Sequence, residues 1–244
     1  MKISVALSIA RREMSSYFFS PIAYVVVCLF LILSAIIFLI FTLRAGGPAE
    51  MRVLFAGLVW VLIPVLPAIG MRLIAEEHRS GTIESLMTCP ISDTQVVLGK
   101  WLGAVGFYVV ILATTFIYVI ALTIWADPDW GPIFTGYVGL LLVGALYLAI
   151  GTFASTLSRN QIVAFLVAVA IILLLTLVAT FLPRAFPDSW QQNMIVMMSY
   201  VNVNDHFEAF RKGLIDTSNF VYFLSGTALF LVLAVKALES RRWR

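Results

Sequence analysis

The sequence predicts an all-α, polytopic membrane protein with six transmembrane helices. Of its 244 residues, 61% are apolar and only 12% are charged, which is outside the range of soluble domains. The charged residues cluster and leave six uncharged runs between the clusters, at 14–43, 53–71, 101–126, 130–158, 160–183 and 217–235. Each run reaches the roughly 20 residues that a helix needs to cross a bilayer core.

These runs and their flanks divide the chain, a single transmembrane domain over 1–244, into elements. Residues 1–20 mix apolar and charged side chains and predict an amphipathic helix lying at the membrane interface. The spans are predicted at 21–43, 53–74, 99–125, 132–157, 161–182 and 218–238. A cytoplasmic loop at 76–90 and an outer segment at 184–216 complete the chain.

The first span is expected to be retained, because it is too long for the apolar part of a signal peptide and lacks a convincing small-residue cleavage site. Pro64 and Pro67 in the second span remove backbone donors and are expected to kink it. Cys28 and Cys89 offer no disulfide framework.

The basic residues predict the orientation of the chain. Six spans place both termini on one side, and that arrangement puts eleven Lys and Arg on the side of the termini against five on the other. Because Lys and Arg in short loops stay preferentially in the cytoplasm, both termini are expected there. The net charge of +3 is explained by this topology and gives no sign of nucleic-acid binding.

The loop at 76–90 has an internal order of its own. A turn at Gly81 precedes a short stripe of Ile83, Leu86 and Met87 at helical spacing, and Pro90 ends it. A helix of barely two turns cannot stabilise itself in water, since helix nucleation is unfavourable without packing. It must dock either on the membrane surface and the span ends or on a cytosolic partner, and the residues alone favour neither.

Two further segments have a distinct composition. The fourth span is rich in small residues, with Ala145 and Ala149, and Gly151 and Ser155, at the four-residue spacing that lets helices approach closely in lipid. Between the last two spans, the apolar and aromatic residues of 189–204 are too few for a seventh span. They predict an interfacial or re-entrant helix in the outer segment.

Several kinds of chemistry have no residues to support them. No phosphate-binding G-x-x-x-x-G-K-[ST] loop is present, and neither the two histidines nor the two cysteines lie at metal-ligand spacing. The six runs contain no Asp, Glu, Lys or Arg that could couple transport to an ion gradient, nor an intramembrane catalytic set. Energy is therefore expected from a partner, although a carrier that binds sodium through backbone and hydroxyl oxygens stays open.

Four segments carry a resemblance to a known family. The loop EEHRSGTIESLMTCP at 76–90 closely resembles the first cytoplasmic loop of type-2 ATP-binding-cassette (ABC) transporter permeases. Supporting segments are EMSSYFFSP at 13–21, AIGTFASTLS at 149–158 and HFEAFRKGLID at 206–216. Within that family the chain looks most similar to the compact permeases of gliding-motility and copper-enzyme-maturation systems.

This resemblance implies a non-catalytic permease subunit, exporter-like, in the inner membrane of a bacterium. It implies a coupling helix in the loop that docks on a separate cytosolic ABC ATPase, which would hold the ATP and magnesium, so the chain itself needs no cofactor. It also implies a second permease chain, identical or different, and an extracytoplasmic accessory protein as a further partner. Carried over residue by residue, the docking candidates are Glu76, Glu77, Arg79, Gly81, Thr82, Glu84, Leu86 and Met87.

Two other functions remain as alternatives. One is an ion-coupled secondary transporter or channel, which uptake driven by a sodium gradient with the chain alone would favour. The other is a membrane scaffold without transport activity. Stimulation of an ATPase in a co-purified complex would favour the permease over both.

Overall fold

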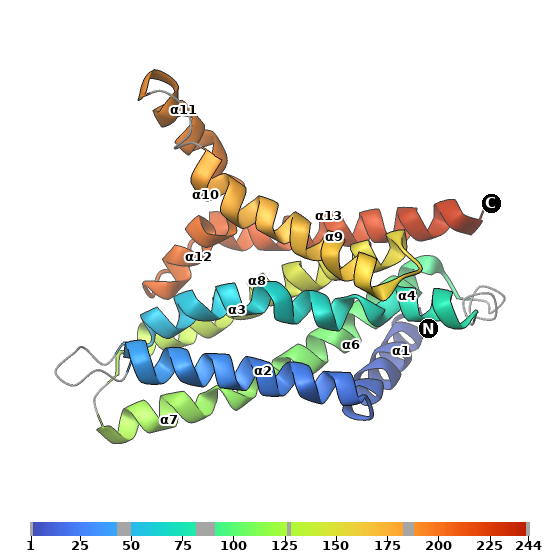
Figure 1. The fold of residues 1–244 in the computed structure, drawn as a ribbon, viewed down its shortest axis with the longest axis horizontal. Coiled ribbons are helices and arrows are strands. Elements are labelled where there is room, and N and C mark those ends of the chain that lie inside the picture. The colour runs from blue at the N-terminus through green and yellow to red at the C-terminus, as the bar shows by residue number, and fades with distance from the viewer. Residues whose placement is uncertain (1, 43–49, 82–90, 126–127, 183–187, 243–244) are drawn as a thin grey trace.

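A computed structural model describes residues 2–42, 50–81, 91–125, 128–182 and 188–242 of the chain. Within these residues, six helical runs are long and apolar enough to cross a membrane, which confirms the predicted fold class. They run roughly side by side in one bundle (Figure 1). The six runs are Pro21–Thr42, Arg52–Glu77, Asp93–Ile124, Trp130–Leu157, Gln161–Phe181 and Thr217–Ser240.

The first and fifth spans lie at the outside of the bundle. The first is α2 (Pro21–Ile37), which continues as the π-helical η1 (Phe38–Thr42). The fifth is α9 (Gln161–Leu173), followed by the π-helical η2 (Leu174–Val178) and α10 (Ala179–Phe181). Only 28% of the apolar window of each span is buried, so both leave long apolar faces for lipid or for another chain.

The second span is longer than the sequence predicts. It comprises α3 (Arg52–Gly70), which contains both prolines, and α4 (Arg72–Ser80), with a break at Met71. The first residues of the predicted loop, 76–80, therefore belong to a helix. The Met71 amide donates to the Pro67 carbonyl at 2.8 Å, so the interruption follows one turn after the second proline.

The third span also begins earlier than predicted, at Asp93 instead of residue 99. It comprises α6 (Asp93–Thr114) and α7 (Phe116–Trp125), separated at Thr115. Ser92 and Gln95 form a capping box, in which the Ser92 hydroxyl accepts from the Gln95 amide and the Gln95 side chain accepts from the Ser92 amide. This reciprocal cap fixes the start of α6 well before the apolar run.

The fourth span, α8 (Trp130–Leu157), is the centre of the bundle, with 83% of its apolar window buried. Its small residues let side chains of neighbouring helices pack against its backbone. A Cβ on Gly144 would lie 2.1 Å from the Tyr108 ring, and one on Gly136 would lie 2.3 Å from the Phe55 ring, so neither position has room for a larger residue. Trp101 and Tyr108 of α6 donate to α8 carbonyls at 3.1 and 2.8 Å. The tight packing predicted for this span is confirmed, and it occurs within one chain.

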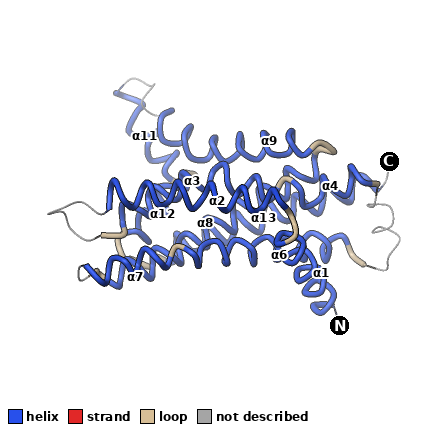
Figure 2. The backbone as a smooth tube through the Cα atoms, turned by 60° about the horizontal axis from the view of Figure 1, so that its bottom comes forward, coloured by secondary structure: helices blue, strands red, loops and turns tan. Residues whose placement is uncertain are grey.

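The predicted outer segment contains two helices, α11 (Asp188–Ser199) and α12 (Val203–Arg211), before the last span α13 (Thr217–Arg242). Helix α11 projects away from the bundle in both views (Figures 1 and 2). Helix α12 is fastened to α8, because the Thr135 hydroxyl donates to the Phe210 carbonyl at 2.7 Å and Gly139 contacts the Phe210 side chain. How these helices lie relative to a membrane surface stays a prediction.

The predicted N-terminal helix is present as α1 (Lys2–Phe18) and packs along α6. The two ends of the chain, α4 and the start of α6 lie at one end of the bundle, whereas α7, α11 and α12 lie toward the other (Figures 1 and 2). The first end holds the described part of the predicted docking loop. The candidate site therefore lies at this end of the bundle.

Candidate functional site

The predicted docking residues divide between the end of α4 and the chain beyond it. Glu76, Glu77 and Arg79 lie on α4, and Gly81 ends that helix with a φ of 73°, a left-handed conformation that glycine adopts without strain. The remaining candidates, Thr82, Glu84, Leu86 and Met87, lie outside the described residues, as does the predicted coupling helix that contains them.

The two glutamates of α4 lie in different surroundings. Glu76 is 56% exposed and forms an ion pair with Arg72, one turn earlier, with 3.5 Å between the Arg72 Nε and the carboxylate. Glu77 is mostly buried, and its carboxylate contacts the Lys100 ammonium at 2.8 Å. Glu76 is thus accessible to a partner, whereas Glu77 is engaged within the chain.

Lys100 is the centre of a buried ion cluster that links three helices. Its Nζ lies 2.8 Å from Glu77 of α4 and 3.1 Å from Glu13 of α1, and its side chain is only 6% exposed on α6. Buried charges are tolerated when they are paired and hydrogen-bonded, and each member then depends on the others. The cluster ties the end of α4 to both α1 and α6.

Sequence reasoning missed the role of Lys100, which was counted only as a basic residue flanking a span. Its acidic partners come from elements far away in sequence, and Glu13 is 87 residues distant. The capping box at Ser92 and Gln95 was a usable signal, because a helix that begins at Asp93 places Lys100 two turns inside it.

Glycines on α6 allow α1 to reach this cluster. A Cβ on Gly99 would lie 2.8 Å from the Ala6 carbonyl oxygen, and one on Gly103 would lie 2.7 Å from Cβ of Glu13. Both distances are shorter than any normal contact, so only glycine permits the two helices to lie this close. The close approach places the Glu13 carboxylate against Lys100.

A second set of contacts joins α1 to the break between α3 and α4. The Tyr17 hydroxyl donates to the Ile69 carbonyl at 3.0 Å, and the Arg72 guanidinium lies over the Tyr17 ring at 4.7 Å. Burial raises the pKa of Tyr17 well above its usual value, and the Glu13 and Glu76 carboxylates add to this rise while Arg72 opposes it. The hydroxyl therefore stays protonated as a donor.

The break itself is held by α8. The Ser155 hydroxyl oxygen accepts from the amides of Ile74 and Ala75 at 2.9 and 2.8 Å and donates to the Met71 carbonyl at 3.0 Å. One buried hydroxyl thus satisfies backbone groups that the interruption of the helix leaves unpaired. Ser155 fixes where α4 starts and in which direction it leaves the bundle.

Replacing Ser155 by alanine is expected to destabilise the protein by about 1–3 kcal/mol, because buried backbone groups lose their partner. The measurement is the midpoint of thermal unfolding in detergent. Ser225→Ala is the matched control, since the exposed Ser225 hydroxyl donates only to the Tyr222 carbonyl within its own helix. Equal midpoints for the two variants would contradict the role given to Ser155.

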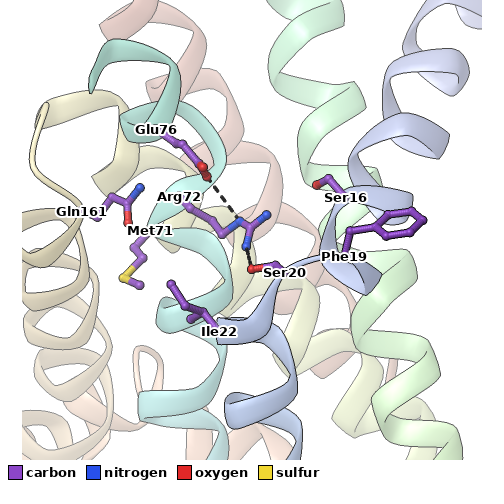
Figure 3. A pocket seen from close by; sticks show the side chains of 8 residues that line it. All are labelled: Ser16, Phe19, Ser20, Ile22, Met71, Arg72, Glu76 and Gln161. Atoms are coloured by element: carbon purple, nitrogen blue, oxygen red, sulfur yellow. Dashed lines mark hydrogen bonds and ion pairs between the residues drawn. The ribbon is translucent and has the colours of Figure 1, made fainter. Parts of the chain in front are cut away.

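A cavity of about 400 Å³ opens between the α1–α2 turn, the α3–α4 break and the start of α9. Arg72 lies in its wall between Glu76 and Ser20 (Figure 3). The other lining residues are Ser16, Phe19, Ile22, Met71 and Gln161. Among the described residues, no group of three or more His, Cys, Asp and Glu side chains could hold a metal ion.

Comparison with known proteins identifies a family for the part of the chain from α3 to α13. Residues 49–241 match the family model described as "ABC-2 family transporter protein". The matched region begins just before α3 and ends near the end of α13, so it includes α4, the predicted loop and Lys100. No curated protein matches the chain.

Proposed function

The chain belongs to the ABC-2 transporter family as a membrane permease, and we propose that its ATPase docks on the end of α4 and residues 81–90. Permease domains of this family have no ATPase activity and pair with separate ABC ATPase subunits. The docking residues are proposed to be Glu76, Glu77, Arg79, Gly81, Thr82, Glu84, Leu86 and Met87. ATP and magnesium would be bound by the partner.

The observation that carries the proposal is the continuation of the second span into α4. A membrane-crossing helix extends past its apolar part, turns at Gly81 and leads directly into 82–90. A force applied to 82–90 therefore acts on α4, which follows α3 at Met71 and is held to α8 by Ser155. The exposed Glu76 carboxylate would offer a charge for setting the register of the partner.

The cluster at Lys100 is proposed to transmit that force sideways. Because Lys100 bonds both Glu77 and Glu13, a displacement of α4 pulls on α6 and on α1 together. In this proposal Glu77 works from inside the permease, as the link between the docked loop, the N-terminal helix α1 and the third span. The ATP-driven approach of two ATPase subunits would then rearrange the spans.

The chain is a multi-pass membrane protein. We place it in the inner membrane of a bacterium with both termini in the cytoplasm. Support comes from the excess of basic residues on the side of the termini and from the position of α1 and the end of α13 at the same end of the bundle as α4 (Figure 1). Helices α11 and α12 would then lie on the outer side, where they could cap an exit or meet an extracytoplasmic accessory protein.

A second permease chain, identical or different, is proposed as a further partner, and the first, fifth and sixth spans each leave most of their apolar window uncovered. The cargo is proposed to be hydrophobic or amphiphilic and to be exported, or the cycle to drive outer machinery. The resemblance to gliding-motility and copper-enzyme-maturation permeases supports this exporter-like type.

Docking can be tested with Gly81→Arg and Leu86→Asp. Each change is expected to lower the amount of ATPase that co-purifies with the permease by about tenfold or more, because the first strains the turn and the second removes an apolar anchor. The measurement is the ratio of ATPase to permease after affinity purification from membranes, with folding checked by a monodisperse peak in gel filtration.

Matched controls exist at the other end of the bundle. Gly213 also has a positive φ, 91°, and the neighbouring Leu214 is exposed. Gly213→Arg and Leu214→Asp are expected to leave the ATPase ratio unchanged. If the two pairs of variants retain the same amount of ATPase, the docking assignment is wrong.

A further inference from the structure

Arg72 is a mostly buried cation whose hydrogen-bonding capacity is little used. Its side chain is 12% exposed, and within the part of the chain that the structure describes it donates one hydrogen bond, to the Ser20 hydroxyl at 2.5 Å. A guanidinium has five N–H donors. Among the described residues its Nε has no hydrogen-bond partner, although it lies 3.5 Å from the Glu76 carboxylate in an ion pair. Leaving such donors unsatisfied is unfavourable, so this group is suited to a further acceptor.

The space for that acceptor lies beside it. The cavity of about 400 Å³ is far larger than a single water needs and is within the size of small-molecule sites. Ser20 accepts from Arg72 and so keeps its own proton for an acceptor in the cavity, and the Gln161 amide faces the same space (Figure 3). Guanidinium and hydroxyl donors together are a typical set for phosphate oxygens.

The cavity also carries the opposite charge. Glu76 lies on its wall with an exposed carboxylate, one turn from Arg72. A single anion would meet this carboxylate unfavourably, whereas a ligand with both a phosphate and an amine would place each charge against its opposite. The pair therefore favours a zwitterionic headgroup.

The rim of the cavity is apolar and continues into the outside of the bundle. Phe19, 86% exposed, points away from Arg72, and the exposed Ile22 begins the face of α2 (Figure 3). The spans α2 and α9 on either side leave most of their apolar surface uncovered. Hydrocarbon chains attached to a headgroup in the cavity would lie along these faces.

We propose that this cavity binds the zwitterionic phosphate–amine headgroup of an amphiphile, with the phosphate at Arg72 and Ser20 and the amine at Glu76. The site lies where α1, α2, α4 and α9 meet, so a bound headgroup contacts the helix that is proposed to receive the ATPase. Binding does not itself require the ATPase. The inference and the docking proposal can therefore fail separately.

The test is native mass spectrometry of the full-length, delipidated permease titrated with three probes. These are phosphatidylethanolamine, phosphatidylglycerol, which keeps the phosphate and chains but lacks the amine, and glycerophosphoethanolamine, which lacks the chains. Phosphatidylethanolamine is expected to bind the most tightly of the three. If glycerophosphoethanolamine binds as tightly, the ligand is a soluble phosphate compound and the assignment to an amphiphile is wrong.

Arg72→Gln is expected to weaken phosphatidylethanolamine binding about tenfold or more, which is the loss of a charge-assisted hydrogen bond. Glu76→Gln should weaken binding of phosphatidylethanolamine but not of phosphatidylglycerol, and so remove the preference between them. Arg52→Gln is the matched control, because Arg52 lies at the other end of the same span and pairs with Glu50 and Asp129 at 3.8 and 4.0 Å.

Ser20→Ala keeps the proposal testable if Arg72→Gln does not fold, since it removes one hydroxyl and keeps the positive charge of Arg72. It should weaken phosphatidylethanolamine binding about threefold or more, because one hydrogen bond to the phosphate is lost. Equal affinities for Ser20→Ala and Arg52→Gln, or for Arg72→Gln and Arg52→Gln, would overturn the site. In each case, retention of the ATPase by the same preparations reports on the docking proposal independently.

Discussion

Replacing Lys100 by methionine is expected to destabilise the permease by about 3–5 kcal/mol, because it leaves the Glu13 and Glu77 carboxylates largely buried without their shared cation. The measurement is the free energy of unfolding in detergent, or the midpoint of thermal unfolding. Lys236→Met is the matched control. Lys236 is 70% exposed and pairs with Glu239 at 2.8 Å, and such surface pairs contribute about 0–1 kcal/mol.

A triple variant separates stability from coupling. Glu13→Gln and Glu77→Gln together with Lys100→Met remove all three charges, so the unfolding midpoint should recover much of its loss. Stimulation of the bound ATPase should not recover, because the link between α4, α1 and α6 is gone. If Lys100→Met is as stable as Lys236→Met, the cluster does not contribute to the stability of the fold. If the triple variant stimulates the bound ATPase as fully as the unchanged permease does, the cluster does not transmit force.

Replacing Gly70 by valine is expected to disrupt the contact between α3 and α8, with a loss of about 3 kcal/mol, the upper end of the range for overpacking. A Cβ at Gly70 would lie 3.0 Å from Cα of Gly151. This Cα is a backbone atom, so it cannot move aside as the end of a flexible side chain can. The two helices must therefore move apart. That movement would pull Ser155 away from the amides of Ile74 and Ala75.

The yield of monodisperse protein and its unfolding midpoint measure this effect. Gly226→Val in α13 is the matched control, because a Cβ there would meet only the ends of the flexible Leu146 side chain, at 3.1 Å or more. The control variant is expected to remain folded. Equal midpoints for Gly70→Val and Gly226→Val would show that the backbone contact at Gly151 does not hold the two helices together.

Local patterns in the sequence predicted much of the fold. The number of spans followed from uncharged runs, since the bilayer requires about 20 apolar residues in a helix. The close packing of α8 followed from the spacing of its small residues, such as Gly151 and Ser155. Both rules concern residues within one helix, which is why a single sequence was sufficient.

The contacts of the candidate site depend on residues that are distant in sequence. Lys100 was placed at the edge of a span because a charge normally ends one, and its pairing with the carboxylates of Glu13 and Glu77 explains why it is tolerated inside the bundle. The break at Met71 likewise depends on Ser155, 84 residues away. No periodicity records such pairs. The sequence predicted a docking loop, but not the helices to which its near end is tied.

The seating of α1 on α6 has a consequence for the order in which the chain is made. Glu13 leaves the ribosome 87 residues before Lys100, and the first two spans follow it before Lys100 emerges. During that time Gly99 and Gly103, against which the N-terminal helix packs, have not been made, and the Glu13 carboxylate has no Lys100 to pair with. Closure of this end of the bundle must therefore wait for translation of the third span, and it completes a topology that the earlier segments have already adopted.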